Sequence, residues 1–224
     1  MKSGDLATRI KLYERATHHH LQPNSHVVIR VDGKAFHTYT RRLRCDKPFD
    51  YDLMSAMLSA VIHTAKEMQG FKLAYTQSDE ATFLITDTDS HQSQPWFDND
   101  LSKLVSITAS AFTMHFNRLF VEGDLSAMFD ARAFTVPESD APNVFVWRQQ
   151  DWERNSLQML ARTHFSDREL HGKGRKDIHD MLMTKSVNWA DLPLSAKNGC
   201  FVAADGGCMP EKLNYAQIMQ LITT

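Results

Sequence analysis

The sequence is poor in cysteine and has none of the cysteine spacings that bind metal. Its 224 residues include only three cysteines, Cys45, Cys200 and Cys208, and no two of them form a C-x-x-C pattern. An odd number of cysteines without such spacing argues against both a disulfide framework and a structural zinc site. We therefore expect reduced thiols.

Long apolar runs are also missing. No stretch approaches the ~18 residues that a membrane-spanning helix needs. The first residues, Met1 to Asp5, lack the apolar core of a secretory signal. We expect a protein with no membrane partner that stays in the cytoplasm.

The chain has no excess of positive charge, and its net charge is −2. Proteins that hold nucleic acid by bulk electrostatics usually have a domain pI above ~9. Any contact with RNA must therefore use local patches, and two basic runs offer them, 41–44 and 171–176. In the second run the charged residues are Lys173, Arg175 and Lys176. No Gly-rich phosphate loop and no Ser-His-Asp arrangement is present.

Acidic residues are present where two strands are expected to end. Asp32 closes the apolar run His26–Gly33, and Asp79 and Glu80 lie at the turn of a two-strand segment, 74–86. Carboxylate oxygens are the ligands that Mg²⁺ prefers, and two such ions can hold the attacking and leaving oxygens of a phosphoryl transfer in line. Turn chemistry is the alternative for both acidic sites, because Asp-Gly is a strong turn signal. The pattern favours a magnesium-dependent phosphoryl-transfer site.

Basic residues near Asp32 indicate the ligand. Arg30 lies two positions earlier on the same strand face, and Lys34 and Lys47 follow. An arginine inside an apolar strand is costly unless it meets a carboxylate or a phosphate. Its alternative partner is a carboxylate of Asp32 or Asp79. We expect a triphosphate to bind here.

Hydrophobic periodicity predicts an α+β fold. Strand-like runs cover 27–31, 73–85 (a hairpin) and 129–136, and apolar residues at helical spacing cover 50–69 and 101–116. The order β-α-β-β-α-β is the ferredoxin-like arrangement. It is also the core of polymerase palm domains, an antiparallel sheet with helices that presents strand-end carboxylates on one face.

Beyond Pro142 the pattern becomes mostly helical. Helices are expected over 144–165, from the Ser166–Glu169 capping box and over 177–184, with a short strand over 200–203. We divide the chain into a palm-like catalytic core, 1–137, and a helical C-terminal region, 138–224, that forms one compact unit with the core.

Two further groups of residues have ambiguous patterns. Arg148, Asp151 and Asn155 share one helix face, which suits either a tRNA contact or a solvated face with an internal Arg–Asp pair. The run 18–20 consists of three histidines, but no second ligand cluster with suitable spacing accompanies it. We therefore do not predict a metal site there.

Five short motifs, taken in order, resemble those of the tRNA-His guanylyltransferase family. They are Val28–His37 (VIRVDGKAFH), Lys47–Asp50 (KPFD), Gln77–Glu80 (QSDE), Phe129–Arg132 (FDAR) and Trp147–Asp151 (WRQQD). The likeness covers nearly the whole chain, and the combination is specific although no single motif is. Members of that family have a palm-like domain and add nucleotides in the 3′-to-5′ direction. They activate a tRNA 5′-phosphate with ATP or GTP.

The resemblance implies a role for each matching residue. Two Mg²⁺ ions would be held by the side chains of Asp32 and Asp79 and by the carbonyl of Gly33, with Glu80 in support of this catalytic set. The nucleotide would be lined by Lys34, Ala35, Phe36, His37 and Ser78, with Lys47 on its triphosphate, and the family's usual assembly is a tetramer. Independently of the resemblance, we expect Arg30 to bind the nucleotide. The basic run and the polar helix face predict contacts with tRNA from Arg148, Asp151, Asn155, Lys173, Arg175 and Lys176.

One departure bears on the substrate. Members dedicated to tRNA-His carry His-Ile-Asn-Asn where this chain has Glu-Arg-Asn-Ser over 153–156, so only the first Asn, Asn155, is kept. The chain is more similar to the guanylyltransferase-like branch, which repairs 5′-truncated tRNAs by template-directed 3′-to-5′ addition. The alternatives are tRNA-His guanylyltransferase proper, which adds G at position −1, a palm-type nucleotide cyclase, and an RNA-binding module without catalysis.

Overall fold

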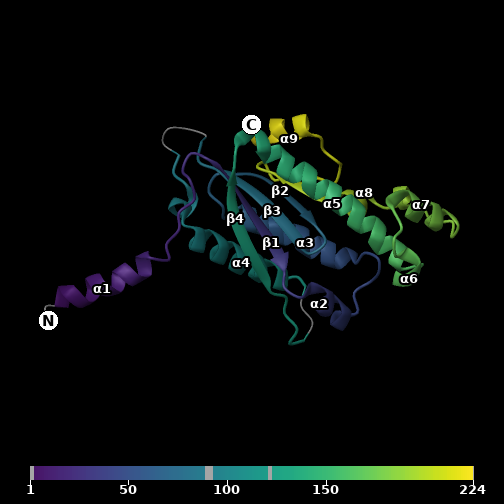
Figure 1. Cartoon of the computed structure of the whole chain (residues 1–224), viewed down its shortest axis with the longest axis horizontal. Helices are drawn as coiled ribbons and strands as arrows, with labels where there is room; N and C mark the ends of the chain where they lie inside the picture. Colours follow the sequence, from purple (N-terminus) through teal and green to yellow (C-terminus); the bar gives the residue numbers. More distant parts are fainter. Residues whose placement is uncertain (1–2, 89–92, 121–122, 224) are drawn as a thin grey trace.

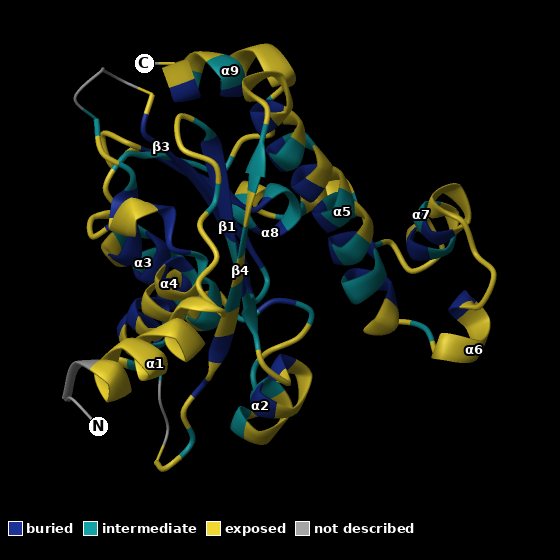
Figure 2. Ribbon diagram, turned by 60° about the vertical axis from the view of Figure 1, so that its left-hand side comes forward, coloured by how far each residue is buried: buried dark blue, intermediate teal, exposed yellow. Residues whose placement is uncertain are grey.

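The computed structural model describes residues 3–88, 93–120 and 123–223. A central sheet carries helices on both faces, and the N-terminal helix α1 (Ser3–Arg15) extends away from this body as an arm (Figure 1). The C-terminal helices α6 (Asp167–Leu170) and α7 (Arg175–Met183) lie at the far end of the long helix α5 (Ala141–Arg162) (Figure 2).

The sheet has six strands in the order β4-β1-β3-β2-β5-β6. All neighbouring strands are antiparallel. The first four follow the ferredoxin-like order, so the predicted α+β palm-like fold is confirmed. The strands are β1 (His26–Gly33), β2 (Phe71–Gln77), β3 (Glu80–Thr86), β4 (Phe129–Val136), β5 (Cys200–Ala203) and β6 (Cys208–Met209).

Both faces of the central strands are buried, because helices cover each of them. Alternate residues of β1 face opposite sides: Ile29 packs with helices α3 and α4, whereas Val28 packs with α5 and α9. This explains why β1 is apolar almost throughout. The helices are α3 (Tyr51–Ala65), α4 (Leu101–Asn117) and α9 (Tyr215–Thr223).

Two aspartates fix the starts of the helices on the first face. The side chain of Asp50 accepts a hydrogen bond from the N–H of Leu53, and that of Asp100 accepts one from the N–H of Lys103. Each satisfies a backbone donor that the first helical turn leaves unpaired. Helix α3 ends at Ala65, four residues before the end of the helical spacing expected over 50–69.

The C-terminal region adds to the same sheet and core. Strand β5 pairs with β2, and the side chains of Phe145 and Phe201 pack with Val28 and Leu73. Helix α5 begins at Ala141 rather than at Val144, with a proline in its first turn, where the missing N–H costs nothing. The preceding turn and the remaining short elements are η2 (Glu138–Asp140), η3 (Trp189–Asp191) and α8 (Leu194–Asn198).

Two elements lie in segments for which no helix was predicted. Helix α2 (Phe36–Leu43) follows β1 directly. The short helix η1 (Trp96–Asn99) lies between the predicted hairpin and the second predicted helix. Within the described ranges, no helix has both the length and the apolar character needed to cross a membrane.

Candidate active site

The end of β1 and the turn of the β2–β3 hairpin meet at one edge of the sheet. Asp32 lies opposite Glu80 in the β1–β3 register. Only Ser78 and Asp79 separate the two hairpin strands, and Ser78 adopts a left-handed φ of 50°. The backbone N–H of Gly33 donates to the carbonyl oxygen of Asp79 at 3.0 Å. The predicted carboxylates of Asp32 and Asp79 are therefore neighbours, and we call them the acidic pair.

Glycine is required at position 33 by this close approach. A Cβ atom built there would lie 2.3 Å from Cδ2 of Phe36 and 3.0 Å from Cβ of Asp79. Carbon atoms do not approach so closely, so any side chain would push the start of α2 or the hairpin turn away. The Asp-Gly sequence thus serves both the turn and the contact between the two acidic strand ends.

The acidic pair has no cationic partner among the described residues. Burial raises the pKa of the Asp79 carboxyl, and the negative charge of Asp32 adds to that rise. A hydrogen bond from Oγ of Ser78 to Oδ1 of Asp79, at 3.0 Å, opposes it. Two neighbouring carboxylates without a counter-charge form an oxygen-ligand set that suits a divalent cation such as Mg²⁺.

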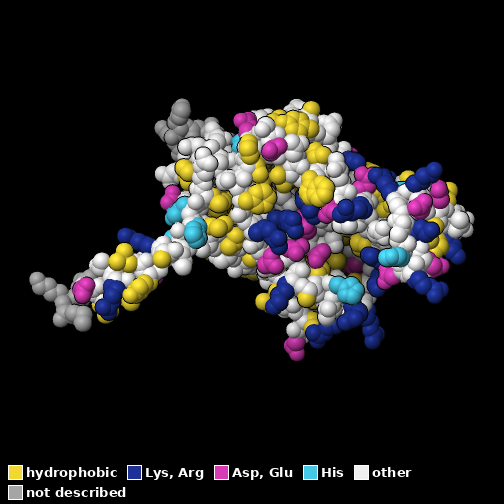
Figure 3. Space-filling view, in the orientation of Figure 1, with side chains coloured by type: hydrophobic (Ala, Val, Ile, Leu, Met, Phe, Trp, Pro, Cys, Tyr) yellow, Lys and Arg dark blue, Asp and Glu magenta, His cyan; other side chains and the backbone are white. Residues whose placement is uncertain are grey.

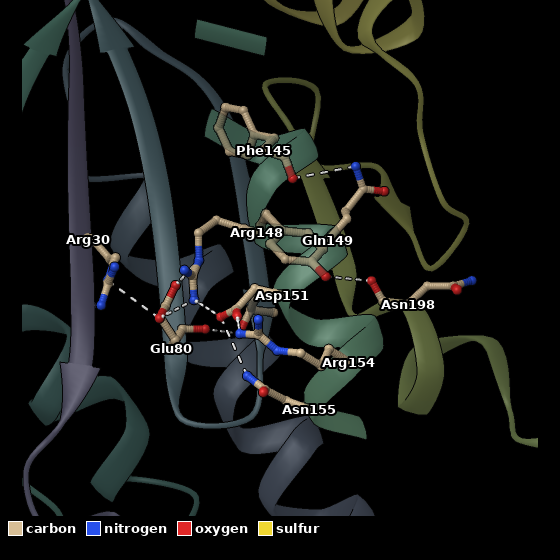
Figure 4. Close-up of polar contacts among 11 residues, drawn as sticks. Arg30, Glu80, Phe145, Arg148, Gln149, Asp151, Arg154, Asn155 and Asn198 are labelled. Atoms are coloured by element: carbon tan, nitrogen blue, oxygen red, sulfur yellow. Dashed lines mark hydrogen bonds and ion pairs between the residues drawn. The ribbon is translucent and has the colours of Figure 1, made fainter. Parts of the chain in front are cut away.

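Glu80 has the opposite surroundings (Figure 4). Its Oε2 accepts a hydrogen bond from Nη2 of Arg148 at 2.7 Å, and its Oε1 lies 2.6 Å from Nε of that arginine. Nε of Arg30 lies 3.4 Å from Oε2. Nη2 of Arg148 also donates to Oδ2 of Asp151 at 3.1 Å. We call Arg30, Glu80, Arg148 and Asp151 the arginine cluster.

Two expectations for the arginines change accordingly. The carboxylate partner of Arg30 is Glu80, not Asp32 or Asp79. The expectation that Arg148 contacts tRNA does not fit its position, because the residue is 8% exposed and its guanidinium is occupied by two carboxylates. The internal Arg–Asp pair on this helix face, which was the alternative, is the one observed.

Arg30 belongs to the cluster and also faces the acidic edge. Its Nε is buried beside Oε2 of Glu80, but its side chain as a whole is 29% exposed. The exposed part of the guanidinium therefore has N–H groups that can donate to the oxygen atoms of a ligand.

Two adjoining cavities open at the acidic edge. A hollow of about 370 Å³ is lined by eight of the predicted residues together with parts of α5. A larger cleft of about 860 Å³ runs from the hairpin turn to α2 and the 45–50 segment. The predicted residues in the hollow are Arg30, Asp32, Ser78, Asp79, Glu80, Arg148, Asp151 and Asn155, and those in the cleft are Phe36, His37, Lys47, Ser78 and Asp79.

The other predicted residues lie apart from these cavities. Lys34 and Ala35 are exposed in the connection from β1 to α2, where the N–H of Lys34 donates to the carbonyl of Met128 at 2.8 Å. The basic residues Lys173, Arg175 and Lys176 are exposed at the start of α7, at the far end of α5 (Figure 2). The structure does not bring them together with the acidic pair.

Glu153, the residue that departs from the family pattern, joins three parts of the C-terminal region. Its Oε1 pairs with Nη2 of Arg175 on α7, and its Oε2 accepts a hydrogen bond from Nζ of Lys212 at 2.6 Å. These two cations lower the pKa of the Glu153 carboxyl against the opposing effect of its burial. Its charge is therefore held ionised and matched within the protein.

Sequence reasoning missed the helix wall of the cleft. Trp152, Met159 and Arg162 on α5 line it together with α2. Trp152 is buried against Phe49 and donates from Nε1 to the carbonyl of Ala196 at 3.1 Å. The seven-residue spacing of Trp152 and Met159 marks one helix face, and this spacing was the signal available.

Comparisons with known proteins identify the family of the chain. The family model of tRNAHis guanylyltransferase (Thg1) matches residues 7–137. The tRNA(His) guanylyltransferase of Schizosaccharomyces pombe is 30% identical over 207 residues, which cover 85% of this chain and 77% of that protein.

Two solved structures of bacterial Thg1-like proteins are also similar. One, in complex with ATP, superposes with a TM-score of 0.93 at 38% identity, covering 98% of this chain and 100% of the other. The second, in complex with GTP, has a TM-score of 0.74 at 36% identity. It covers 89% of this chain and 84% of the other. With its motifs, its palm-like sheet and these likenesses, the chain belongs to the tRNAHis guanylyltransferase family and is a nucleotidyltransferase.

Proposed function

We propose that this protein adds nucleotides to the 5′ ends of tRNAs in the 3′-to-5′ direction, in a magnesium-dependent and template-directed reaction that repairs truncated tRNAs. The observation that carries the proposal is the acidic pair, which has no counter-charge among the described residues and opens onto two cavities whose walls contain both basic and acidic side chains. The solved structures of similar proteins with ATP and GTP support nucleotides as substrates.

Mg²⁺ would be held by the carboxylates of Asp32 and Asp79 and by the carbonyl of Gly33. The donor set fits this ion, because all three ligands are oxygens and no described cation competes for the carboxylates. When bound, Mg²⁺ neutralises charge on the phosphoryl group being transferred. We propose that two Mg²⁺ ions bind at this site.

The chain's own residues would bind and orient the triphosphate. The exposed Lys47 lies in the cleft wall, where its ammonium can meet phosphate oxygens as a point charge. Arg30 also lines the hollow, where the exposed part of its guanidinium offers further donors. Phe36, His37 and Ser78 would complete the nucleotide site. The role of Glu80 is to hold Arg30 and Arg148 in place next to the ligands.

Glu153 supports the repair activity over dedicated addition of G to tRNA-His. Where the dedicated members have a neutral or cationic ring, this chain has a carboxylate, which repels phosphate. Here the carboxylate is used within the protein, as the partner of Arg175 and Lys212. Base pairing would then supply the discrimination, while the protein reads the shape and phosphates of the acceptor stem, as is usual for double-stranded RNA.

The distal cations are our proposed contact for that stem. Lys173 and Lys176 are exposed, and no described residue pairs with either of them in an ion bridge. Asn155 in the hollow would lie nearer the reacting end. A tetramer, implied by the family resemblance, is also part of the proposal.

A template swap tests the proposal. The protein is incubated with ATP, the four NTPs, Mg²⁺ and a 5′-monophosphorylated tRNA that lacks its first nucleotide, in four versions that differ only in the opposing base. We expect the added nucleotide to be the Watson–Crick partner in each version, read on a sequencing gel. Addition of G whatever the opposing base, and only to tRNA-His, would instead identify a dedicated guanylyltransferase. A cyclic product from NTP alone would indicate a cyclase.

A further inference from the structure

Three metal-ligating side chains come together at the base of the α1 arm, away from the acidic pair. One ligand atom from each of His18, His20 and Asp100 lies within 4.8 Å of the others. Histidine side chains are visible where the arm joins the body (Figure 3). His18 and Asp100 are 82 positions apart, so nothing in the local spacing reveals the cluster.

Backbone pairing holds the two segments together. His20 and Asp100 form an antiparallel bridge. The N–H of Leu101 donates to the carbonyl of His19 at 2.8 Å, and the N–H of Leu21 donates to the carbonyl of Asn99 at 2.9 Å. The cluster is therefore positioned by main-chain hydrogen bonds on both sides of the bridge, not by side-chain contact alone.

Residues two apart in an extended segment point to the same side. His18 and His20 both lie beside Asp100, whereas His19 between them is not part of the cluster. All three histidines are exposed. Only the first and third belong to the cluster, which gives the segment a built-in control.

The separation between two of the ligand atoms suits a tetrahedral ion. Nδ1 of His18 lies 3.4 Å from Oδ2 of Asp100. Ligands bound to Zn²⁺ at about 2.0–2.1 Å in tetrahedral geometry are separated by roughly 3.3–3.4 Å. Oδ1 of Asp100 is already occupied by the N–H of Lys103 at 3.0 Å. This leaves Oδ2 as the ligand atom of a carboxylate that is 4% exposed and fixed in orientation.

A partner outside the cluster orients the second imidazole. Nδ1 of His20 lies 2.9 Å from the carbonyl oxygen of Asp98, which can only accept a hydrogen bond. With its proton on Nδ1, this imidazole carries its lone pair on Nε2. Such a hydrogen bond to a backbone carbonyl is the usual second contact of a metal-binding histidine.

We propose that His18, His20 and Asp100 bind a Zn²⁺ ion that fastens the base of the α1 arm to the start of α4. Imidazole nitrogen and a single carboxylate oxygen favour Zn²⁺ over Mg²⁺. Three protein ligands leave a fourth position for water. The competing explanation is a simple ion pair between a protonated His18 and Asp100, which needs no metal.

The test is a zinc titration of untagged, chelator-treated protein in excess Mg²⁺, so that the oxygen-only acidic pair is already filled. We expect one Zn²⁺ per chain and a rise in melting temperature on binding. His18→Ala and His20→Ala should each weaken zinc binding at least about tenfold. Asp100→Asn should do the same while keeping the helix cap, because Asn caps as well as Asp does.

His19→Ala is the matched control and should leave zinc affinity unchanged within about twofold, since it removes a neighbouring exposed histidine that is not part of the cluster. Equal losses in all three histidine variants would show surface binding without a site. Wild-type affinity no tighter than that of His18→Ala would support the ion pair. Either result overturns the proposal.

Discussion

Asp79 and Glu80 are adjacent in the chain, yet their carboxylates occupy opposite electrostatic surroundings. Burial raises the pKa of both. For Asp79 the negative charge of Asp32 adds to the rise, whereas for Glu80 the guanidiniums of Arg148 and Arg30 oppose it. The acidic pair is therefore short of positive charge, and the arginine cluster beside it is internally paired. The acidic pair is suited to bind an external cation, and the arginine cluster stabilises the wall of the hollow next to it.

The largest expected effect breaks the acidic pair. Asp32→Ala and Asp79→Ala should each lower the rate of nucleotide addition by at least about 10³-fold, because each removes charge stabilisation at the transferring phosphoryl group. The melting temperature of the metal-free protein should not fall, since repulsion between the two carboxylates is relieved. Rates on a truncated tRNA and thermal melting provide the two measurements.

The exposed Asp180 on α7 offers the control, and Asp180→Ala should retain the wild-type rate. A rate near wild type in either acidic-pair variant would exclude these carboxylates as metal ligands.

The next largest effect is expected when the arginine cluster is disrupted, and it is measured as a change in the free energy of unfolding. Arg148→Ala leaves Glu80 buried without its main partner and should lower the free energy of unfolding by about 3–5 kcal/mol. Replacing both, with Glu80→Leu and Arg148→Met, should restore part of that loss, because the buried carboxylate is then removed together with its main partner and only the partly exposed Arg30 loses its ion pair. Denaturant unfolding measures both variants.

Arg154 pairs with Asp151 from the same helix but its side chain is 65% exposed. Arg154→Ala should therefore cost only about 0–1 kcal/mol. If Arg148→Ala were as mild as this control, Glu80 would not depend on the buried pair.

A smaller effect concerns the cleft. Lys47→Ala should weaken nucleotide triphosphate binding by about 10- to 100-fold, the range expected for loss of one hydrogen bond to a charged group. Binding of tRNA should change less. Lys103 on α4 is also exposed but lies on the helix-covered face away from the cleft, so Lys103→Ala should bind nucleotide normally. A lower melting temperature with unchanged nucleotide affinity would make Lys47 structural.

The smallest expected effect is a pH dependence of stability that arises from the raised pKa of Asp79. A carboxyl whose pKa is raised by folding binds its proton more tightly in the folded state, so the free energy of unfolding decreases as pH rises from the ordinary aspartate value through the raised one. Asp79→Asn removes this dependence. Without metal, the variant should melt higher than wild type at pH 7 and lose that advantage near pH 3 to 4, around the ordinary aspartate pKa of about 3.9. An advantage that does not depend on pH would point to a cause other than ionisation.

The order of strands was predictable because each element has a recognisable pattern in its own short stretch of sequence. The apolar run of β1, the amphipathic pattern of α3 and the hairpin with its acidic turn follow directly from residue spacing, and their order leaves few topologies. Helix α2 was missed because it begins immediately after Ala35, at a left-handed φ of 51°, and buries only Phe36 and Tyr39. Such a short helix has little periodicity to read.

Tertiary pairing was the part that spacing could not supply. The carboxylates were placed at strand ends from local pattern, but the partner of Glu80 comes from 68 residues further along the chain. For the same reason the histidines 18–20 gave no sign of a site until Asp100 was found beside them. Ligands contributed by distant segments have no fixed sequence interval.

The length of helix α5 has a further consequence for the choice of substrate. It runs for 22 residues, roughly 33 Å at 1.5 Å per residue. Arg148 attaches its first half to the acidic edge, and Leu160 packs its far end against Ile178 on α7. The 12 residues from one anchor to the other correspond to about 18 Å. Because the helix is continuous, its number of turns sets the distance between the acidic edge and the basic residues near α7. Under the proposed function, a stem of the wrong length would miss one end, so the enzyme would measure its substrate without reading a base.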